Sequence, residues 1–175
     1  MILKAEEIIK LPDFIGQNLS IIQEKLDALE VLIRGYTHNN FQVRKIRCSG
    51  ASADKKVLCS HPFLKVDDTV QISESEVNDG LYVIKDVQDG YIQLDKDLYP
   101  VPHNLITLIK YPADIKQGII ELMKWEQINR QKVGIKAETL SRHSVTYFDQ
   151  DANNQVRGYP VSLLGFLESY KKARF

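Results

Sequence analysis

Long hydrophobic runs and an excess of either charge are both missing from this 175-residue chain. No apolar run approaches the roughly 20 residues that a membrane-spanning helix needs, so no membrane protein is expected. The N-terminal stretch lacks the layout of a secretory signal because Glu6 and Glu7 interrupt it, and we expect the chain to act where it is made. The 23 basic residues equal the 23 acidic ones, and this balance gives no overall attraction to nucleic acid or to a membrane surface.

Cysteine is scarce, and the two cysteines favour a reducing compartment over a disulfide framework. Cys48 and Cys59, with His61 nearby, raise the alternative of a metal site. The spacing contains no C-x-x-C pair and only one nearby histidine, which does not suit zinc. The sequence therefore predicts two half-buried thiols in neighbouring strands, with no metal and no cofactor.

Local motifs of catalysis are also lacking. The chain contains no nucleophile elbow, Walker loop, HExxH or Gly-rich dinucleotide turn. A catalytic triad assembles from residues distant in sequence, so the missing motifs do not by themselves exclude one. The histidines all fall in turns or strand-like stretches, at His38, His61, His103 and His143. Surface positions explain histidines in such places, and we expect a protein that is not an enzyme.

The longest well-bounded helical pattern covers residues 113–134. Pro112 precedes it and Gly134 offers a stop. Gly118 lies inside, where glycine costs about 1 kcal/mol relative to alanine. Apolar residues recur along one broad face at Ile115, Ile119, Ile120, Leu122, Met123, Trp125 and Ile128. This face is too wide for a single partner, so we expect helices from both ends of the chain to cover it.

Shorter helices are predicted at the two ends. An amphipathic helix over residues 3–11 is followed by a longer one from about residue 18 to 34, which Gly35 ends. A last helix begins near Pro160.

Between residues 41 and 111 the hydrophobic period changes from 3.6 toward 2. Six short strand-like runs are separated by turns, at residues 41–46, 57–59, 70–72, 81–84, 91–94 and 105–109. Asp89-Gly90 is a strong hairpin signal, and Asn78-Asp79-Gly80 is a second turn. We therefore predict an α+β fold: a small antiparallel β-barrel of residues 41–110, inserted into a bundle of about four helices from residues 1–40 and 111–175.

A local basic cluster lies in the first strands of the predicted barrel, at Arg44, Lys45, Arg47, Lys55 and Lys56. In a small barrel such a cluster could contact phosphates, which favours a nucleic-acid-binding module as an alternative function. A solvated strand face is the simpler explanation. Residues 63–100 carry nine acidic residues against three lysines, and this excess of negative charge would repel a polyanion.

The segment from Lys136 to Phe148 alternates like one long strand between two helices. No adjacent segment of the helical part offers it a partner, and a lone strand leaves its N–H and C=O groups unpaired. It must pair with the barrel or with another chain, unless it is merely an extended loop.

Two motifs and their order resemble the head–tail connector, or adaptor, proteins of long-tailed bacteriophages and related prophages. The first motif is an acidic residue followed by a small polar strand, here Glu138 and Ser144–Tyr147 (SVTY). The second is a last helix that ends in a tyrosine, basic residues and an aromatic, here Tyr170–Phe175 (YKKARF). The resemblance covers residues 1–40 and 111–175. Compact members of that family lack the predicted barrel, which is similar to small β-barrel modules inserted in some larger connector proteins.

The resemblance implies a structural protein of the virion neck, present in the host cytoplasm during assembly. Such proteins bind the portal protein after DNA packaging and form a ring, here expected to be twelve-fold, that extends the DNA channel. They then dock the head-closure (stopper) or tail-completion protein, while packaged double-stranded DNA passes through without sequence-specific binding. We expect contacts between subunits along the strand, at Glu138, Ser141, His143, Val145 and Tyr147. We expect contacts with the portal at the tail, at Tyr170, Lys171, Lys172, Arg174 and Phe175.

Overall fold

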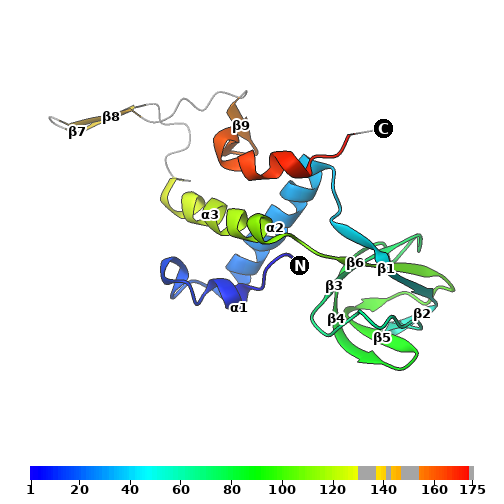
Figure 1. The fold of residues 1–175 in the computed structure, drawn as a ribbon. Helices are drawn as coiled ribbons and strands as arrows, with labels where there is room; N and C mark the ends of the chain where they lie inside the picture. Colours follow the sequence, from blue (N-terminus) through cyan, green and yellow to red (C-terminus); the bar gives the residue numbers. More distant parts are fainter. Residues whose placement is uncertain (130–136, 141–142, 147–153, 174–175) are drawn as a thin grey trace. The chain divides into compact units, whose positions relative to one another are not determined.

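The computed structural model describes residues 1–129, 137–140, 143–146 and 154–173, and the chain divides into two compact units (Figure 1). The sheet unit comprises Met1–Lys4 and His38–Tyr111, and the helical unit comprises Ala5–Thr37 and Pro112–Phe175. The protein is thus α+β.

The first four residues belong to the sheet unit, whereas the sequence placed them with the helices. The Met1 ammonium donates to Thr69 Oγ1 at 3.0 Å, and the Thr69 hydroxyl donates to the Met1 carbonyl at 2.9 Å. Lys4 Nζ lies 2.8 Å from Asp67 Oδ1. These contacts hold the N-terminal residues on the sheet unit.

The helical unit contains, among its described residues, α1 (Ala5–Ile8), the 3-10 helix η1 (Pro12–Phe14), α2 (Leu19–Thr37), α3 (Ala113–Asn129) and the 3-10 helix η4 (Val161–Tyr170). Helix α1 is shorter than the predicted helix over 3–11. Helix α2 continues through Gly35, so the predicted stop there was wrong. It ends where His38 adopts a left-handed φ of 50°, a conformation that cannot continue a right-handed helix.

Helix α3 packs against α2 and η4, as the width of its apolar face led us to expect. Its buried residues are Ile115, Gly118, Ile119, Leu122 and Met123. Ile128 is 67% exposed and does not extend the face. A Cβ added at Gly118 would overlap the ring of Phe166 from η4, so this glycine permits the close approach of the two helices. The predicted stop at Gly134 lies outside the described residues.

The sheet unit holds one six-stranded antiparallel sheet with the strand order β1-β6-β3-β4-β5-β2 (Figure 1). Its strands are β1 (Gln42–Gly50), β2 (Ser52–Val57), β3 (Thr69–Ser73), β4 (Gly80–Gln88), β5 (Tyr91–Leu98) and β6 (Asn104–Ile109). Five of the six predicted strands are present. The second was misplaced, because the sequence put it at residues 57–59 and β2 ends at Val57. The Asp89-Gly90 hairpin is confirmed, since Gln88 pairs with Tyr91 and Gly90 has a φ of +87°.

The predicted closure into a barrel is wrong, because β1 and β2 form the two free edges of the sheet. Only Ala51 separates these strands. The β2–β5 ladder is shifted between Asp54 and Lys56, and Asp54 has a left-handed φ of 54°. The segment after β2 covers the core instead, since Leu64 is buried among the inward side chains of the sheet. This segment thus closes the core where a β1–β2 ladder would have closed a barrel.

Cys48 and Cys59 form a disulfide with their Cα atoms 5.9 Å apart, so the prediction of two free thiols was wrong. Cys48 lies on β1 and Cys59 directly follows Leu58, which comes after β2. The bond therefore ties β1 to the segment that covers the core. Sequence spacing alone gave no indication of this, because the strand arrangement brings the two residues together.

Strands β7 (Ala137–Leu140) and β8 (His143–Thr146) pair with each other in an antiparallel two-stranded sheet. The prediction of one long strand without an internal partner was therefore wrong. Glu138 pairs with Val145, and Leu140 pairs with His143. A second small sheet joins β9 (Gln155–Val156) to β10 (Tyr159–Pro160).

Candidate assembly surfaces

The C-terminal tail, where we predict contact with the portal, is bound to helices of its own unit. The Tyr170 hydroxyl lies 2.8 and 2.7 Å from the two carboxylate oxygens of Asp114, to which it donates. The Lys172 N–H donates to the Thr37 carbonyl at 2.8 Å. Arg174 and Phe175 lie outside the described residues. The described part of the tail is thus anchored to the helical unit, and its contact with the portal stays a prediction.

Lys171 joins a surface cluster that links η4 to α2. Its Nζ donates to Glu168 Oε1 at 2.8 Å and lies 4.1 Å from the centre of the Tyr36 ring. The Tyr36 hydroxyl donates to the same carboxylate oxygen at 2.8 Å. The hydrogen bond from Lys171, and then that from Tyr36, lowers the pKa of Glu168, while Glu168 raises the pKa of Lys171. The hydrogen bond to Asp114 likewise raises the pKa of Tyr170. Because these groups are exposed to solvent, we read the cluster as orienting the tail more than stabilising the fold.

The residues predicted to join subunits are distributed over the two-stranded sheet. Glu138 lies on β7, whereas His143 and Val145 lie on β8. Ser141 and Tyr147 fall outside the described residues. In the described part of the chain, β7 and β8 pair with no other strand, so each keeps one outer edge.

The basic cluster is divided by the fold. Arg44 and Lys45 are exposed on β1. On β2, Lys55 lies 3.7 Å from Asp97, and the Lys56 Nζ lies 4.7 Å from the centre of the Tyr91 ring. Arg47 is half-buried, and its Nε makes no hydrogen bond. The two lysines are therefore engaged within the sheet unit, which leaves two exposed cations for a phosphate contact.

Metal and nucleophile candidates gain no support from the geometry. The disulfide removes both thiolates from the suggested zinc set. In the described residues, no three side chains of histidine, cysteine, aspartate or glutamate gather as a metal would require. His61 Nδ1 accepts a hydrogen bond from the Phe63 N–H at 3.3 Å, and His103 Nε2 lies 3.6 Å from Glu74 Oε2. These contacts are those of loop histidines.

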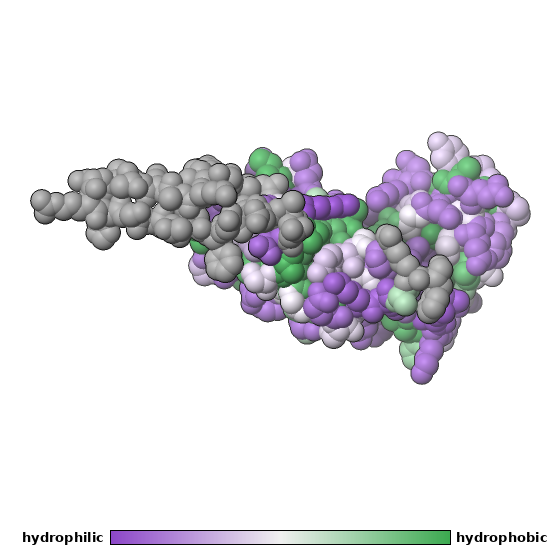
Figure 2. Space-filling model, turned by 90° about the horizontal axis from the view of Figure 1, so that it is seen from above, coloured by the Kyte–Doolittle hydropathy of each residue, from purple (hydrophilic) through white to green (hydrophobic). Residues whose placement is uncertain are grey.

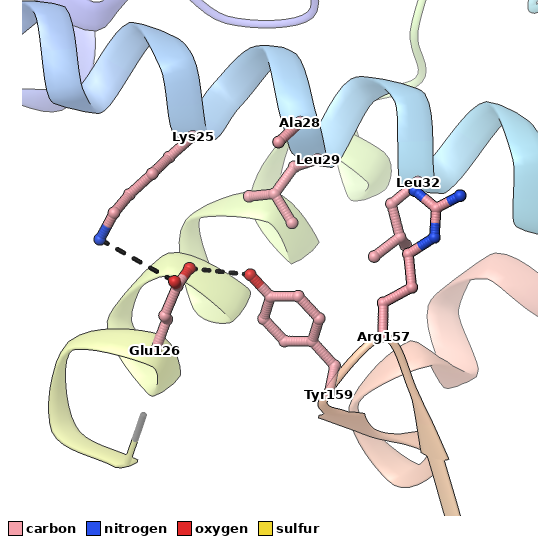
Figure 3. Close-up of a pocket in the computed structure, with 7 residues that line it drawn as sticks. All are labelled: Lys25, Ala28, Leu29, Leu32, Glu126, Arg157 and Tyr159. Carbon is pink, nitrogen blue, oxygen red and sulfur yellow. Dashed lines mark hydrogen bonds and ion pairs between the residues drawn. The ribbon is translucent and has the colours of Figure 1, made fainter. Parts of the chain in front are cut away.

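The helical unit contains a pocket of about 190 Å³ that the sequence did not indicate (Figure 3). Its lining comes from α2 (Lys25, Ala28, Leu29, Leu32), α3 (Glu126) and the β9–β10 turn and strand (Arg157, Tyr159). Glu126 is occupied by its neighbours. It accepts a hydrogen bond from the Tyr159 hydroxyl at 2.8 Å, and Lys25 Nζ lies 4.0 Å from its other oxygen.

Arg157 lies at the other end of this pocket, beside Leu32 (Figure 3). It occupies the first turn position between β9 and β10 with a left-handed φ of 50°, followed by Gly158 at +85°. Arginine is rare in this conformation, and strained positions of this kind cluster at functional sites. Within the part of the chain that the structure describes, the guanidinium makes no hydrogen bond or ion pair. The pocket thus combines an apolar wall with a paired Lys25 and Glu126 at one end and, at the other, the charge of Arg157, for which the described residues supply no partner.

A buried polar network shapes one end of the sheet unit. Asn78 is 2% exposed, and its Nδ2 donates to Ser52 Oγ at 3.2 Å, to the Tyr99 carbonyl at 2.9 Å and to Asn104 Oδ1 at 3.2 Å. Asn78 Oδ1 accepts from the Tyr99 N–H at 2.9 Å. The sequence identified Asn78 only as a turn residue. The network fixes the loop over residues 74–79, which presents Val77 to solvent at 57% exposure.

The visible surface mixes small hydrophobic areas with mainly hydrophilic side chains (Figure 2). None of the helices in the described ranges combines the length and apolarity of a membrane span.

Comparison with known protein families finds no matching family model, and no curated protein matches the chain either.

Proposed function

We propose that this protein is a head–tail adaptor of a long-tailed bacteriophage or prophage. In this role it binds the portal after DNA packaging, forms a twelve-fold ring that extends the DNA channel, and docks a head-closure or tail-completion protein. It is a structural protein of the virion neck and not an enzyme. The sheet unit is an insertion into the connector domain, which the helical unit represents.

The observation that carries the proposal is the isolated pair β7–β8. A two-stranded sheet alone is marginally stable in water, and this one pairs with no further strand among the described residues. Its outer edges offer backbone groups that strands from neighbouring copies can satisfy by strand addition. A two-stranded sheet with two outer edges thus stands where the sequence predicts a lone strand. Two edges suit a ring in which each subunit touches two neighbours.

The arrangement of the helical unit adds support. Both motifs that carry the resemblance, Glu138 with Ser144–Tyr147 and the tail Tyr170–Phe175, belong to the unit that contains α3. Lys172 is fixed to Thr37 of this unit by a backbone hydrogen bond. A tail anchored at its base and carrying cationic and aromatic residues beyond it suits a contact with a portal, because arginine and aromatic residues dominate interface hot spots.

Proline scanning of β8 tests the proposal. Successive N–H groups along a strand point to opposite edges. Of the two variants Ser144→Pro and Val145→Pro, one therefore removes an N–H donor of the β7–β8 ladder, and the other removes an N–H donor of the outer edge of β8. The free-edge variant should keep the fold of the monomer yet fail to form a ring on the portal. Each variant would be supplied to a phage that lacks the gene, and infectious particles would be counted.

The matched control is a proline at the exposed loop position Ser60, which lies outside every strand. It should complete heads like the wild type. Wild-type titres from both β8 variants would refute the role of β7–β8 in assembly.

A further inference from the structure

The lining of the pocket in the helical unit suits a group that combines an apolar side chain with one negative charge. Its walls are Ala28, Leu29, Leu32 and the ring of Tyr159. Glu126 is already satisfied by Tyr159 and Lys25. The charge left over is that of Arg157, which has no partner in the described part of the chain. A volume of about 190 Å³ accommodates one aliphatic side chain together with a neighbouring carboxylate.

Few places on this chain offer such a combination. Among the exposed large hydrophobic residues of the described ranges, three have a carboxylate directly next to them in sequence: Val31, Val66 and Val77. Glu30, beside Val31, is only 4% exposed. Asp67, beside Val66, is paired with Lys4 at 2.8 Å.

Val77 and its neighbour Glu76 are the remaining pair. Glu76, beside Val77, is exposed and makes no ion pair or hydrogen bond within the described residues. Val77 is 57% exposed.

Glu76 and Arg157 also share an unusual backbone feature. Glu76 has a φ of 64° and Arg157 a φ of 50°, so both lie in the left-handed region that residues with a Cβ rarely adopt. Such positions cost of order 1–3 kcal/mol and persist where the surrounding structure enforces them. Asn78 enforces the first through its buried hydrogen bonds, and the two-residue β9–β10 turn enforces the second. Each turn thus presents an exposed charge that no described residue pairs, and the two charges are opposite.

We propose that the Glu76–Val77 turn of one copy docks in the Arg157 pocket of the next copy. Val77 enters between Leu29, Leu32 and Tyr159, and the Glu76 carboxylate accepts hydrogen bonds from the Arg157 guanidinium. The contact joins two different surfaces, so it propagates from copy to copy and suits a ring. The inference rests on the proposed ring and names a second contact within it. Each docking event is weak alone, and a circular template strengthens it through many simultaneous contacts.

Sedimentation of the full chain over a concentration series in low salt tests this docking. The wild type should associate with rising concentration, and added salt should weaken the association. Arg157→Ala and Glu76→Ala should each weaken it by about tenfold. An equimolar mixture of these two variants should stop at dimers, because one working pocket and one working turn remain per pair. Arg157→Glu combined with Glu76→Arg in one chain should return to within about threefold of the wild type.

Glu74→Ala provides the matched control. Glu74 lies in the same loop with a φ of 61°, but His103 lies 3.6 Å from its carboxylate. This variant should associate like the wild type. Trp125 fluorescence and an intact Cys48–Cys59 bond confirm that every variant is folded.

Three results would overturn the inference. They are a wild type that remains monomeric at about 1 mM in low salt, single variants that associate as well as the wild type, and a charge-swapped chain that does not recover. If Arg157→Ala forms normal rings on the portal, this docking is wrong and the adaptor function stands. If the Arg157 and Glu76 variants and the charge-swapped chain associate as expected but the wild type does not bind the portal, the docking stands and the adaptor function is wrong.

Discussion

Replacing Gly118 by alanine should destabilise the helical unit, although alanine is the better helix former. A Cβ at this position would overlap ring atoms of Phe166 and lie 2.6 Å from its Cε1. The gain in helix propensity is about 1 kcal/mol. Forcing a ring out of a packed interface costs typically about 1–3 kcal/mol. The net expectation is a loss of stability of up to about 2 kcal/mol.

The sign of this effect should reverse when the ring is removed. In a Phe166→Ala background nothing obstructs the new methyl group, so Gly118→Ala should stabilise by about 1 kcal/mol. Urea unfolding followed by the fluorescence of Trp125 gives the free energies, because this single tryptophan lies on α3 and reports on the helical unit. Its ring centre is 5.7 Å from that of Tyr159.

Gly35→Ala is the matched control, since an added Cβ there meets nothing within 4 Å in α2. It should stabilise by up to about 1 kcal/mol in either background. If Gly118→Ala has the same effect in both backgrounds within about 0.5 kcal/mol, Phe166 does not restrict this position and the packing argument is refuted.

Four further results are expected. Replacing Cys48 and Cys59 by serine should lower the stability of the sheet unit by about 3 kcal/mol, because the bond closes a loop with a sequence separation of 11; equal denaturation midpoints for oxidised and reduced protein would contradict this. Asn78→Ala should cost about 2–4 kcal/mol by leaving buried partners unsatisfied, and thermal unfolding measures it. The lowered pKa of Glu168 means that its contribution is complete above the usual value of 4.5 and is lost as the pH falls below it, so NMR signals of the tail should change in that acidic window and not near neutrality. A fragment of residues 38–111 should fold alone and give dispersed amide signals, and a collapsed spectrum would show that the sheet unit depends on the rest of the chain.

Five of the six strands of the sheet unit were predictable because their signals are local. Alternating side chains and the Asp89-Gly90 turn identify β4 and β5 and their pairing. Closure of the sheet was not predictable in the same way. It depends on whether β1 and β2, separated by Ala51, pair with each other, and no local pattern decides this. The disulfide was missed for the same reason, since the path after β2 brings Cys59 to Cys48.

The two-stranded sheet β7–β8 was missed because its sequence lacks turn chemistry. Ser141-Arg142 contains none of the glycine, asparagine or aspartate residues that mark two-residue hairpins, so the alternation read as continuous. The pocket was missed for a related reason. The β9–β10 turn has two left-handed positions, Arg157 and Gly158, and only the second is a glycine. Arginine at the first position does not indicate a turn in the sequence.

Electron microscopy of the wild-type chain with the portal protein encoded by the same phage genome tests the central claim most directly. The adaptor account predicts a ring of twelve copies seated on one face of the portal, coaxial with its channel, in which β7 and β8 contact the strands of adjacent copies. A portal that binds no copies, or binds them without a ring around the channel, would contradict it.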